Sequence, residues 1–271
     1  MKKKDNYLVI GNKGFIGSRL VKYLKKKNYK VYNSKSSFNC NESTNVIYCI
    51  GSDDWLKKPL KTYESNFIHL FNVIKKINNF KSFIFLSSTR LYLDNPKKKV
   101  KEKDNLIIKS NKRYIFNIQK LLSESLLMNS IKSSNIKIIR LSNIYSYELH
   151  QKTFLSTIIK NSIIKKKIII SLNINSSKDY ISIDDAIRNI YLLSKKKVNG
   201  IFNLGSGKNI TVKKIIGKIK KITGCEVLIS NQNNFENYPL LNLSKIKKII
   251  NFKIKDNLLN DLPKIIINEK N

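Results

Sequence analysis

Three glycines follow the first apolar run of the chain at regular spacing. The run NYLVI leads into GNKGFIGS, which holds Gly11, Gly14 and Gly17 at the start of a helical pattern. In such a turn Gly11 permits the tight bend, Gly14 lets the backbone approach a pyrophosphate, and Gly17 allows close contact of helix and strand. The first helical N–H groups, around Phe15 and Ile16, then face the anion. The spacing predicts a dinucleotide-binding turn, with a purely structural glycine turn as the alternative.

A second group of residues combines an amine, an aromatic ring and a hydroxyl. In IFNIQKLL, Phe116 and Lys120 are four residues apart, which is about one helical turn. Ser88 ends the apolar run KSFIFLSS. Tyr114 lies six residues before Lys120, about 600° of helical rotation, and so points to a different side. IFNIQKLL is therefore either a reaction centre that lacks one of its parts or an ordinary amphipathic core helix.

Continuous apolar runs alternate with helical patterns through the first half of the chain. A parallel sheet covered on both faces produces such runs, because its strands are buried on both sides. The sequence therefore predicts an α/β fold with a doubly wound, Rossmann-like sheet. The expected strands are 6–10, 29–32, 45–50, 81–88 and 136–141, and the expected helices between them include 65–77 and 117–130.

The alternation of apolar runs and helical patterns changes after about residue 150. A helix over 153–164 is followed by shorter apolar runs and several weaker helical patterns. We expect two domains: a dinucleotide-binding Rossmann domain over 1–150, and a small α/β substrate-binding lobe over 151–271. The last strands of the main sheet are expected to be interleaved with this lobe.

Several classes of protein do not fit the composition. No stretch approaches the ~18 consecutive apolar residues of a membrane span. The basic start MKKK is followed by about four apolar residues, whereas a secretory signal has roughly 7–15. We therefore expect a cytoplasmic protein without a membrane span.

Cysteine and histidine are too sparse to suggest a metal site. Cys40, Cys49 and Cys225 do not form a CxxC pair, and His69 and His150 are far apart in the sequence. We expect neither a metal centre nor a catalytic triad built on histidine.

The formal net charge of +35 raises the question of a nucleic-acid partner. Nearly all the basic residues are lysines, and their triplets are spread along the chain, while surfaces that read bases favour the bidentate arginine. We expect no specific nucleic-acid partner. The charge is compatible with attraction to nucleotide phosphates.

Seven segments, in order along nearly the whole chain, resemble the extended short-chain dehydrogenase/reductase family. This family contains nucleotide-sugar epimerases, dehydratases and reductases. The spacing GxxGxxG resembles its cofactor turn, and SSKDYISIDDA resembles its RDYIxVxD segment. The other matching segments are NVIYCIG, YESNF, FIFLSSTRLY, IIRLSNIY, and FNLGSG followed by TVKKI.

The resemblance assigns catalytic roles and exposes one departure. In the family a Tyr and a Lys four apart on a helix handle the proton, with a Ser or Thr from the preceding strand. Lys120 and Ser88 match two of these positions, but Phe116 stands at the Tyr position and a phenyl ring has no proton to exchange.

Three interpretations of this departure stay open. Phe116 replaces the Tyr and leaves a slow or silent cofactor-binding protein. Alternatively, Tyr114, Tyr92 or a water molecule carries the proton. In the third interpretation the register is shifted and IFNIQK belongs to the core.

The resemblance also suggests cofactor and substrate residues. Ile50 and Asn66 match positions on the cofactor side, together with Lys120. At the end of the second strand, Asn33 stands where a carboxylate would bind the ribose of NAD, and Lys35 follows. The cofactor is therefore expected to be NADP or NAD, with a preference for NADP.

Asn143 and Lys178 resemble positions that contact the substrate nucleotide. Lys178 stands in place of the family's Arg and cannot make the bidentate hydrogen bonds that an Arg makes to phosphate.

The implied function is an NAD(P)-dependent epimerase or keto-reductase acting on a nucleotide-activated sugar; in the first of the three interpretations, Phe116 impairs its activity. A 4,6-dehydratase is disfavoured, because Thr89 and Arg90 occupy the places of the family's acidic pair. The alternative is a catalytically silent dinucleotide-binding protein with a regulatory or scaffold role. The family resemblance is also compatible with a homodimer.

Overall fold

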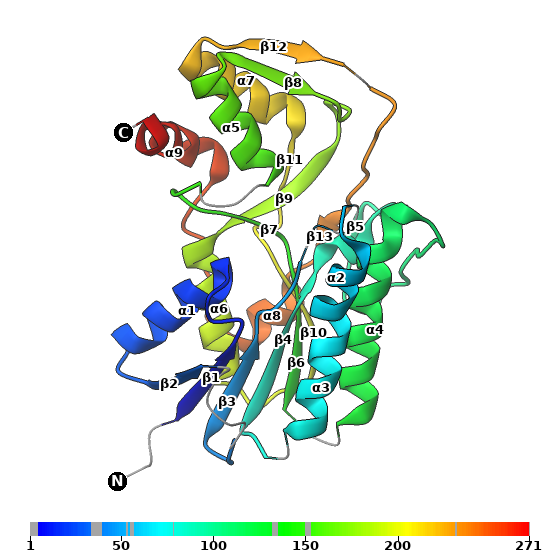
Figure 1. Ribbon diagram of the computed structural model, residues 1–271, viewed down its shortest axis with the longest axis vertical. Helices are drawn as coiled ribbons and strands as arrows, with labels where there is room; N and C mark the ends of the chain where they lie inside the picture. The colour runs from blue at the N-terminus through cyan, green and yellow to red at the C-terminus, as the bar shows by residue number, and fades with distance from the viewer. Residues whose placement is uncertain are drawn as a thin grey trace.

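A parallel sheet of six strands forms the centre of the molecule (Figure 1). The computed structural model describes residues 5–33, 40–52, 54, 57–77, 79–131, 135–149, 153–230 and 232–270. The strand order is β10-β6-β4-β3-β1-β2, and every neighbouring pair is parallel. The strands are β1 (Asn6–Ile10), β2 (Lys30–Asn33), β3 (Thr44–Tyr48), β4 (Ser82–Ser88), β6 (Ile136–Leu141) and β10 (Gly200–Leu204). This sheet confirms the predicted doubly wound α/β fold.

The order of the strands reverses at β1. The chain first places β2 on one side of β1 and then crosses to place β3 on the other side. In open α/β sheets, ligands bind at the carboxyl ends of the strands where the order reverses. The topology therefore points to a binding crevice above the ends of β1 and β3.

Helices cover both faces of the sheet. In Figure 1, α1 (Phe15–Lys26) and α6 (Ile183–Ser194) lie on one face, and α3 (His69–Lys76) and α4 (Ile115–Ser130) lie on the other. Among the described residues, no helix is both long enough and apolar enough to cross a bilayer. The remaining helical segments of this part are α2 (Pro59–Tyr63), η1 (Glu64–Ile68), η2 (Thr89–Tyr92), η3 (Lys112–Tyr114) and α8 (Ser244–Ile249).

Successive residues of β4 contribute to different cores, as the alternation of side chains along a strand requires. Ile84 and Leu86 belong to the core that contains residues of α1 and α6. Phe83 and Phe85 belong to the core shared with α3 and α4. Burial on both faces explains why the middle of β4, residues 83–86, is an unbroken apolar run.

A smaller lobe lies beyond the carboxyl ends of the strands and has its own hydrophobic core (Figure 1). Its helices are α5 (Phe154–Ile164), α7 (Val212–Thr223) and α9 (Leu258–Lys270). Its strands are β7 (Asn143–Tyr145), β8 (Lys167–Ile170), β9 (Ser177–Ser182), β11 (Asn209–Thr211) and β12 (Glu226–Ile229). A short pair, β5 (Lys99–Val100) and β13 (Leu240–Leu241), joins two connecting segments.

The chain passes between the sheet and the lobe more than once. After β9 it returns through α6 and β10, which are parts of the sheet layer, and then re-enters the lobe at β11. The domain boundary expected at residue 150 therefore stays a prediction. These crossings of the chain connect the lobe to the sheet at more than one point.

Lys137 is a fully buried cation near the start of β6. Its ammonium donates to the Asn135 side-chain oxygen at 2.5 Å. None of the ion pairs found among the described residues includes it. Burial lowers the pKa of Lys137 to about 8. The charged form is therefore disfavoured in the folded protein.

We expect Lys137→Met to raise the free energy of unfolding at pH 7 by about 1–3 kcal/mol, since each pKa unit corresponds to ~1.4 kcal/mol. The folded pKa lies below that of the unfolded chain, so the wild type gains stability as the pH rises from about 8 to 10.5. In Lys137→Met, the rise of stability with pH should be smaller by the contribution of Lys137. The similar contribution of Lys120 should remain. Urea unfolding at pH 7 and pH 10 measures both effects. A variant less stable than the wild type at pH 7 would refute this interpretation.

Candidate functional site

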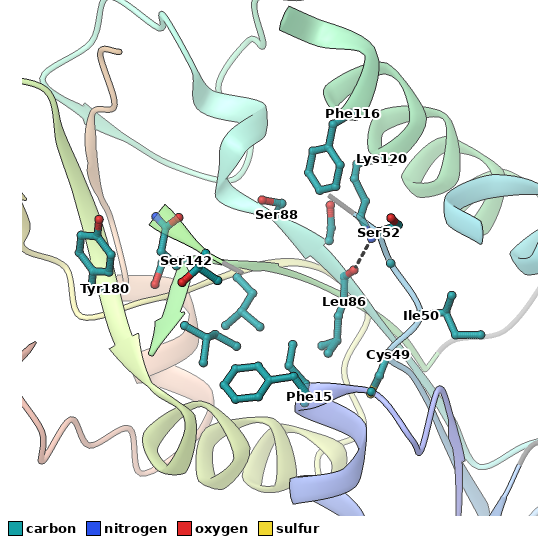
Figure 2. A pocket seen from close by; sticks show the side chains of 18 of the residues that line it. Phe15, Cys49, Ile50, Ser52, Leu86, Ser88, Phe116, Lys120, Ser142 and Tyr180 are labelled. Atoms are coloured by element: carbon teal, nitrogen blue, oxygen red, sulfur yellow. Dashed lines mark hydrogen bonds between the residues drawn. The ribbon is translucent and has the colours of Figure 1, made fainter. Parts of the chain in front are cut away.

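A cavity of about 540 Å³ lies where the topology predicts a crevice. Its lining comes from the turn after β1, the loop after β3, the end of β4, one side of α4, and the facing edge of the lobe (Figure 2). The lining residues are Gly14–Ile16, Cys49–Ser52, Leu86–Ser88, Phe116, Lys120, Leu141–Ile144, Thr153–Leu155, Lys178 and Tyr180.

The glycine turn closes the cavity at the amino end of α1. Gly11 has a φ of +87°, a conformation that L side chains rarely adopt, and the Gly14 N–H donates to the Gly11 oxygen at 2.9 Å. A Cβ on Gly17 would overlap that same oxygen, so only glycine lets α1 approach so closely. Gly14 is the N-cap and offers no side-chain acceptor. The first N–H groups of α1 are therefore available to an anionic ligand.

Asn66 fixes the loop that follows β3. It lies in η1, a π-helical segment of the kind often found at functional sites. Its side-chain oxygen accepts the Ser52 N–H at 2.7 Å, and its amide donates to Ser52 O and to the Gln119 side chain. Asn66 is fully buried and is not part of the lining. It positions the Ile50–Ser52 wall from behind.

Phe116 and Lys120 both line the cavity from α4 (Figure 2). The Lys120 Nζ donates to the Leu86 backbone oxygen at 3.0 Å. It lies 4.8 Å from the centre of the Phe85 ring and 5.8 Å from that of Phe116. These contacts hold the amine beside the end of β4. The segment IFNIQK thus contributes to the cavity wall.

The surroundings of Lys120 make its amine a weak base. Burial lowers the pKa of Lys120 to about 8, although Glu124 and Cys49 act in the opposite direction. The carboxylate of Glu124, one turn along α4, is held by Arg140 at 2.7 Å and by the Ser87 hydroxyl. The nearest carboxylate along the helix is therefore already paired elsewhere.

Ser88 ends β4 and belongs to the same part of the lining as Phe116 and Lys120 (Figure 2). Its hydroxyl oxygen accepts the N–H of Arg90 at 3.1 Å. The hydroxyl proton of Ser88 is thus left for a ligand in the cavity.

Neither tyrosine considered as a substitute proton carrier is in the cavity lining. Tyr114 donates to Asp94 at 2.6 Å, and burial raises its pKa to about 12. Tyr92 donates to Asn203 at 2.7 Å and accepts from Arg140, and burial raises its pKa to about 12. Both side chains are about 1% exposed. The geometry gives neither hydroxyl a path to the cavity.

The lobe contributes the other wall of the cavity. Lys178 and Tyr180 lie two residues apart on β9 and both line the cavity, whereas Asp179 between them points away. Asp179 accepts three backbone N–H groups from residues 206–208 and anchors that loop. Asn143 is exposed to the cavity and donates to the Asp179 backbone oxygen at 3.0 Å.

A carboxylate that sequence reasoning missed lies next to Lys178. Glu236 forms ion pairs with Lys178 at 2.6 Å and with Arg90 at 3.5 Å. The segment around Glu236 has no motif, so nothing in the sequence indicated this pairing. Tyr180 was also missed, although the period-two alternation from Lys178 could have placed it in the cavity.

A comparison with models of protein families agrees with the geometry of this cavity. The family model described as "NAD dependent epimerase/dehydratase family" matches residues 7–50 and 36–205. The chain belongs to this family. Comparison with curated protein sequences gives no significant match.

Solved structures of epimerases and dehydratases share the fold of the chain along almost its whole length. A tyrosine-to-phenylalanine mutant of the UDP-glucuronic acid 4-epimerase from Bacillus cereus, in complex with UDP-4-deoxy-4-fluoro-glucuronic acid and NAD, is 19% identical, with a TM-score of 0.82 and coverage of 97% and 98% of the two chains. The UDP-N-acetylglucosamine 4-epimerase from Methanobrevibacter ruminantium is 20% identical, with a TM-score of 0.79 and coverage of 98% of each chain. The dTDP-glucose 4,6-dehydratase from Bacillus anthracis, in complex with NAD, is 16% identical, with a TM-score of 0.77 and coverage of 98% and 97%.

As a member of the epimerase/dehydratase family, the chain has most of its expected site residues around one cavity. Gly14, Phe15, Ile16 and Ile50 form the wall next to α1, while Ser88, Phe116 and Lys120 form the wall at β4 and α4. Asn143 and Lys178 line the same cavity from β7 and β9 of the lobe. Lys35, His150 and the side chain of Asn33 lie outside the described residues, so the preference for NADP stays a prediction.

Proposed function

We propose that the chain binds a nicotinamide dinucleotide in this cavity and acts as an epimerase or keto-reductase on a nucleotide-activated sugar. The observation that carries the proposal is the meeting of two elements in one cavity. The uncapped amino end of α1, framed by Gly11, Gly14 and Gly17, opens onto the same space as Ser88 and Lys120. The amino end of α1 suits a diphosphate, and the side chains of Ser88 and Lys120 suit an alcohol or ketone.

The residues present fit the dinucleotide. The close approach of α1 to Gly11 and the absence of a capping side chain leave room and donors for its diphosphate. A Cβ on Gly51 would lie 3.3 Å from the Lys120 Nζ, so glycine keeps the space in front of the amine open. When bound, the nicotinamide ring supplies a hydride acceptor and donor. Ser88 and Lys120 would orient the sugar oxygen, and Asn143 and Lys178 would hold the nucleotide side.

The choice between NAD and NADP depends on the end of β2. Solved structures of the same fold hold NAD, which supports NAD for this chain. The sequence argument for NADP rests on Asn33 and Lys35. Titration of the protein with NADH and NADPH, followed by turnover assays with a panel of nucleotide sugars and their 4-keto forms, tests both the cofactor and the reaction.

A catalytically silent dinucleotide-binding protein is the second candidate. Phe116 favours it, because the family's phenol position carries a phenyl ring and neither Tyr92 nor Tyr114 lines the cavity. Cofactor binding without turnover of any sugar in the panel is the expected behaviour of such a protein.

We also propose that two copies of the chain pair through the outer face of α4 and the adjoining η1 and α3. Ile118, Leu122 and Met128 of α4 and Phe71 of α3 are each about 40% exposed. Both charged residues of α4, Lys120 and Glu124, are buried, so its outer face is uncharged in a chain of net charge +35. Two strongly basic copies can therefore meet along α4 without repulsion between charges of that helix, whereas Lys75 lies over the Phe71 ring of α3. Sedimentation equilibrium distinguishes a dimer from a monomer.

A further inference from the structure

The cavity holds few groups able to exchange a proton. Among the described lining residues, the titratable ones are Cys49, Lys120, Lys178 and Tyr180. Lys178 is paired with Glu236, and burial raises the pKa of Cys49 to about 12. Tyr180 lies on the opposite side of the cavity from Phe116 and Lys120 (Figure 2). Beside Ser88, this leaves the amine of Lys120.

We propose that Lys120 is itself the acid–base residue of this site, and that its amine takes and returns the proton of the substrate hydroxyl in place of the phenol that Phe116 lacks. This inference rests on the proposed function of the cavity. It differs from the role that the family resemblance gives Lys120, which is to hold the ribose and assist a tyrosine.

The geometry of Lys120 suits this role. The side chain is 4% exposed, and one N–H is used by the Leu86 oxygen at 3.0 Å. None of the ion pairs within the described ranges includes Lys120. Aromatic rings, Phe85 and Phe116, lie within 6 Å of the Nζ. The other hydrogens of the nitrogen, or its lone pair when the amine is neutral, are therefore available to a ligand in the cavity.

Burial brings the Lys120 amine close to the point at which it exchanges its proton near physiological pH. The titratable groups that influence it are Glu124 on its own helix and Cys49 at the end of β3. Glu124 is neutralised by Arg140, and the thiol of Cys49 is uncharged. Burial therefore dominates and lowers the pKa of Lys120 to about 8. An acid–base group works best with a pKa near the operating pH.

The proton and electron balance is complete. When the sugar alcohol is oxidised, its O–H bond breaks and an N–H bond forms on the neutral amine, which becomes an ammonium. The C–H electron pair would go as hydride to the nicotinamide ring that a bound dinucleotide would supply. When the ketone is reduced, the ammonium returns the proton to the oxygen. An epimerisation uses both halves, so one amine serves the whole cycle.

Lys120→Arg separates this role from simple ribose binding. A guanidinium keeps the positive charge and the donors but does not lose its proton in proteins. We expect the NADH affinity of Lys120→Arg to stay within about tenfold of the wild type, while kcat falls by roughly 10²-fold or more. The double variant Lys120→Arg with Phe116→Tyr should regain turnover, because it restores a phenol. Wild-type kcat in Lys120→Arg would overturn the proposal.

Two further readouts do not depend on that variant folding. Labelling of amines with acetic anhydride, followed by mass spectrometry of the Lys120 peptide, should give a midpoint near pH 8 and protection by NADH, with exposed Lys220 as the reference. The kcat for alcohol oxidation by the wild type should rise with pH to a midpoint near 8 and then level off. A flat profile between about pH 6 and 9, or no turnover by a protein that binds NADH, overturns the proposal.

The failure of the proposed function would look different. A wild type that binds neither NADH nor NADPH contradicts the dinucleotide site itself. The labelling experiment would still report the state of the Lys120 amine in that case.

Discussion

Phe116→Tyr is expected to raise kcat for the nucleotide-sugar reaction at pH 7 by about 10²-fold, within the 10²–10⁴-fold range typical of a positioned acid–base group. Phe116 lines the cavity one helical turn from Lys120, with its ring centre 5.8 Å from the Nζ. A phenol at this place would lie beside a cation, which favours the phenolate and lowers the phenol's pKa. At pH 7 this phenol would exchange the proton in place of the Lys120 amine, which is mostly protonated at that pH.

The pH dependence of Phe116→Tyr provides an internal check. The rise of kcat with pH should move below its wild-type midpoint near 8, because the group that loses its proton has changed. Phe116→Leu is the matched control, since it alters the ring without adding a proton donor, and should show no gain. If Phe116→Tyr binds NADH as the wild type does but turns over no faster, Phe116 does not occupy the proton-transfer position.

Glu124→Ala should lower the free energy of unfolding by about 3–5 kcal/mol, the usual cost of leaving one partner of a buried ion pair alone. The Arg140 and Glu124 side chains are 4% and 2% exposed, and two guanidinium nitrogens donate to the carboxylate. The pair ties α4 to β6, and the Ser87 hydroxyl adds β4. Urea unfolding at pH 7 measures the loss.

A surface ion pair offers the comparison for Glu124→Ala. Lys167 and Glu226 lie 3.4 Å apart with side chains 41% and 57% exposed. Exposed pairs contribute about 0–1 kcal/mol, so Glu226→Ala should change stability little. If the two variants lose the same stability, the buried network does not anchor α4 as described.

Sequence patterns predicted the central strands well because these are buried on both faces. The expected strands 6–10 and 136–141 coincide with β1 and β6, and the expected helix 117–130 covers most of α4, Ile115–Ser130. The helix expected over 65–77 has a π-helical beginning, Glu64–Ile68, that apolar periodicity does not distinguish from an α-helix. The short strands β5, β7, β11 and β13 have two or three residues each, too few for a periodic signal.

The candidate site was predictable where its geometry is local. The glycine turn and the Phe116–Lys120 pair depend on spacing within one turn or one helix, and spacing is visible in the sequence. The Glu236–Lys178 and Arg140–Glu124 pairs join residues from different elements, so spacing along the chain does not show them. The state of Lys120 depends on burial against Phe85 and Leu86, which only the assembled fold provides.

The most direct test of the account is the affinity of the purified wild-type protein for NADH and NADPH, measured by fluorescence titration. Each step from the α1 turn to the chemistry of Lys120 needs a diphosphate held at Gly14. We expect saturable binding of at least one of the two in the micromolar range, weakened by Gly14→Asp, which would place a carboxylate at the mouth of the turn. No binding of either at millimolar concentration would contradict the account.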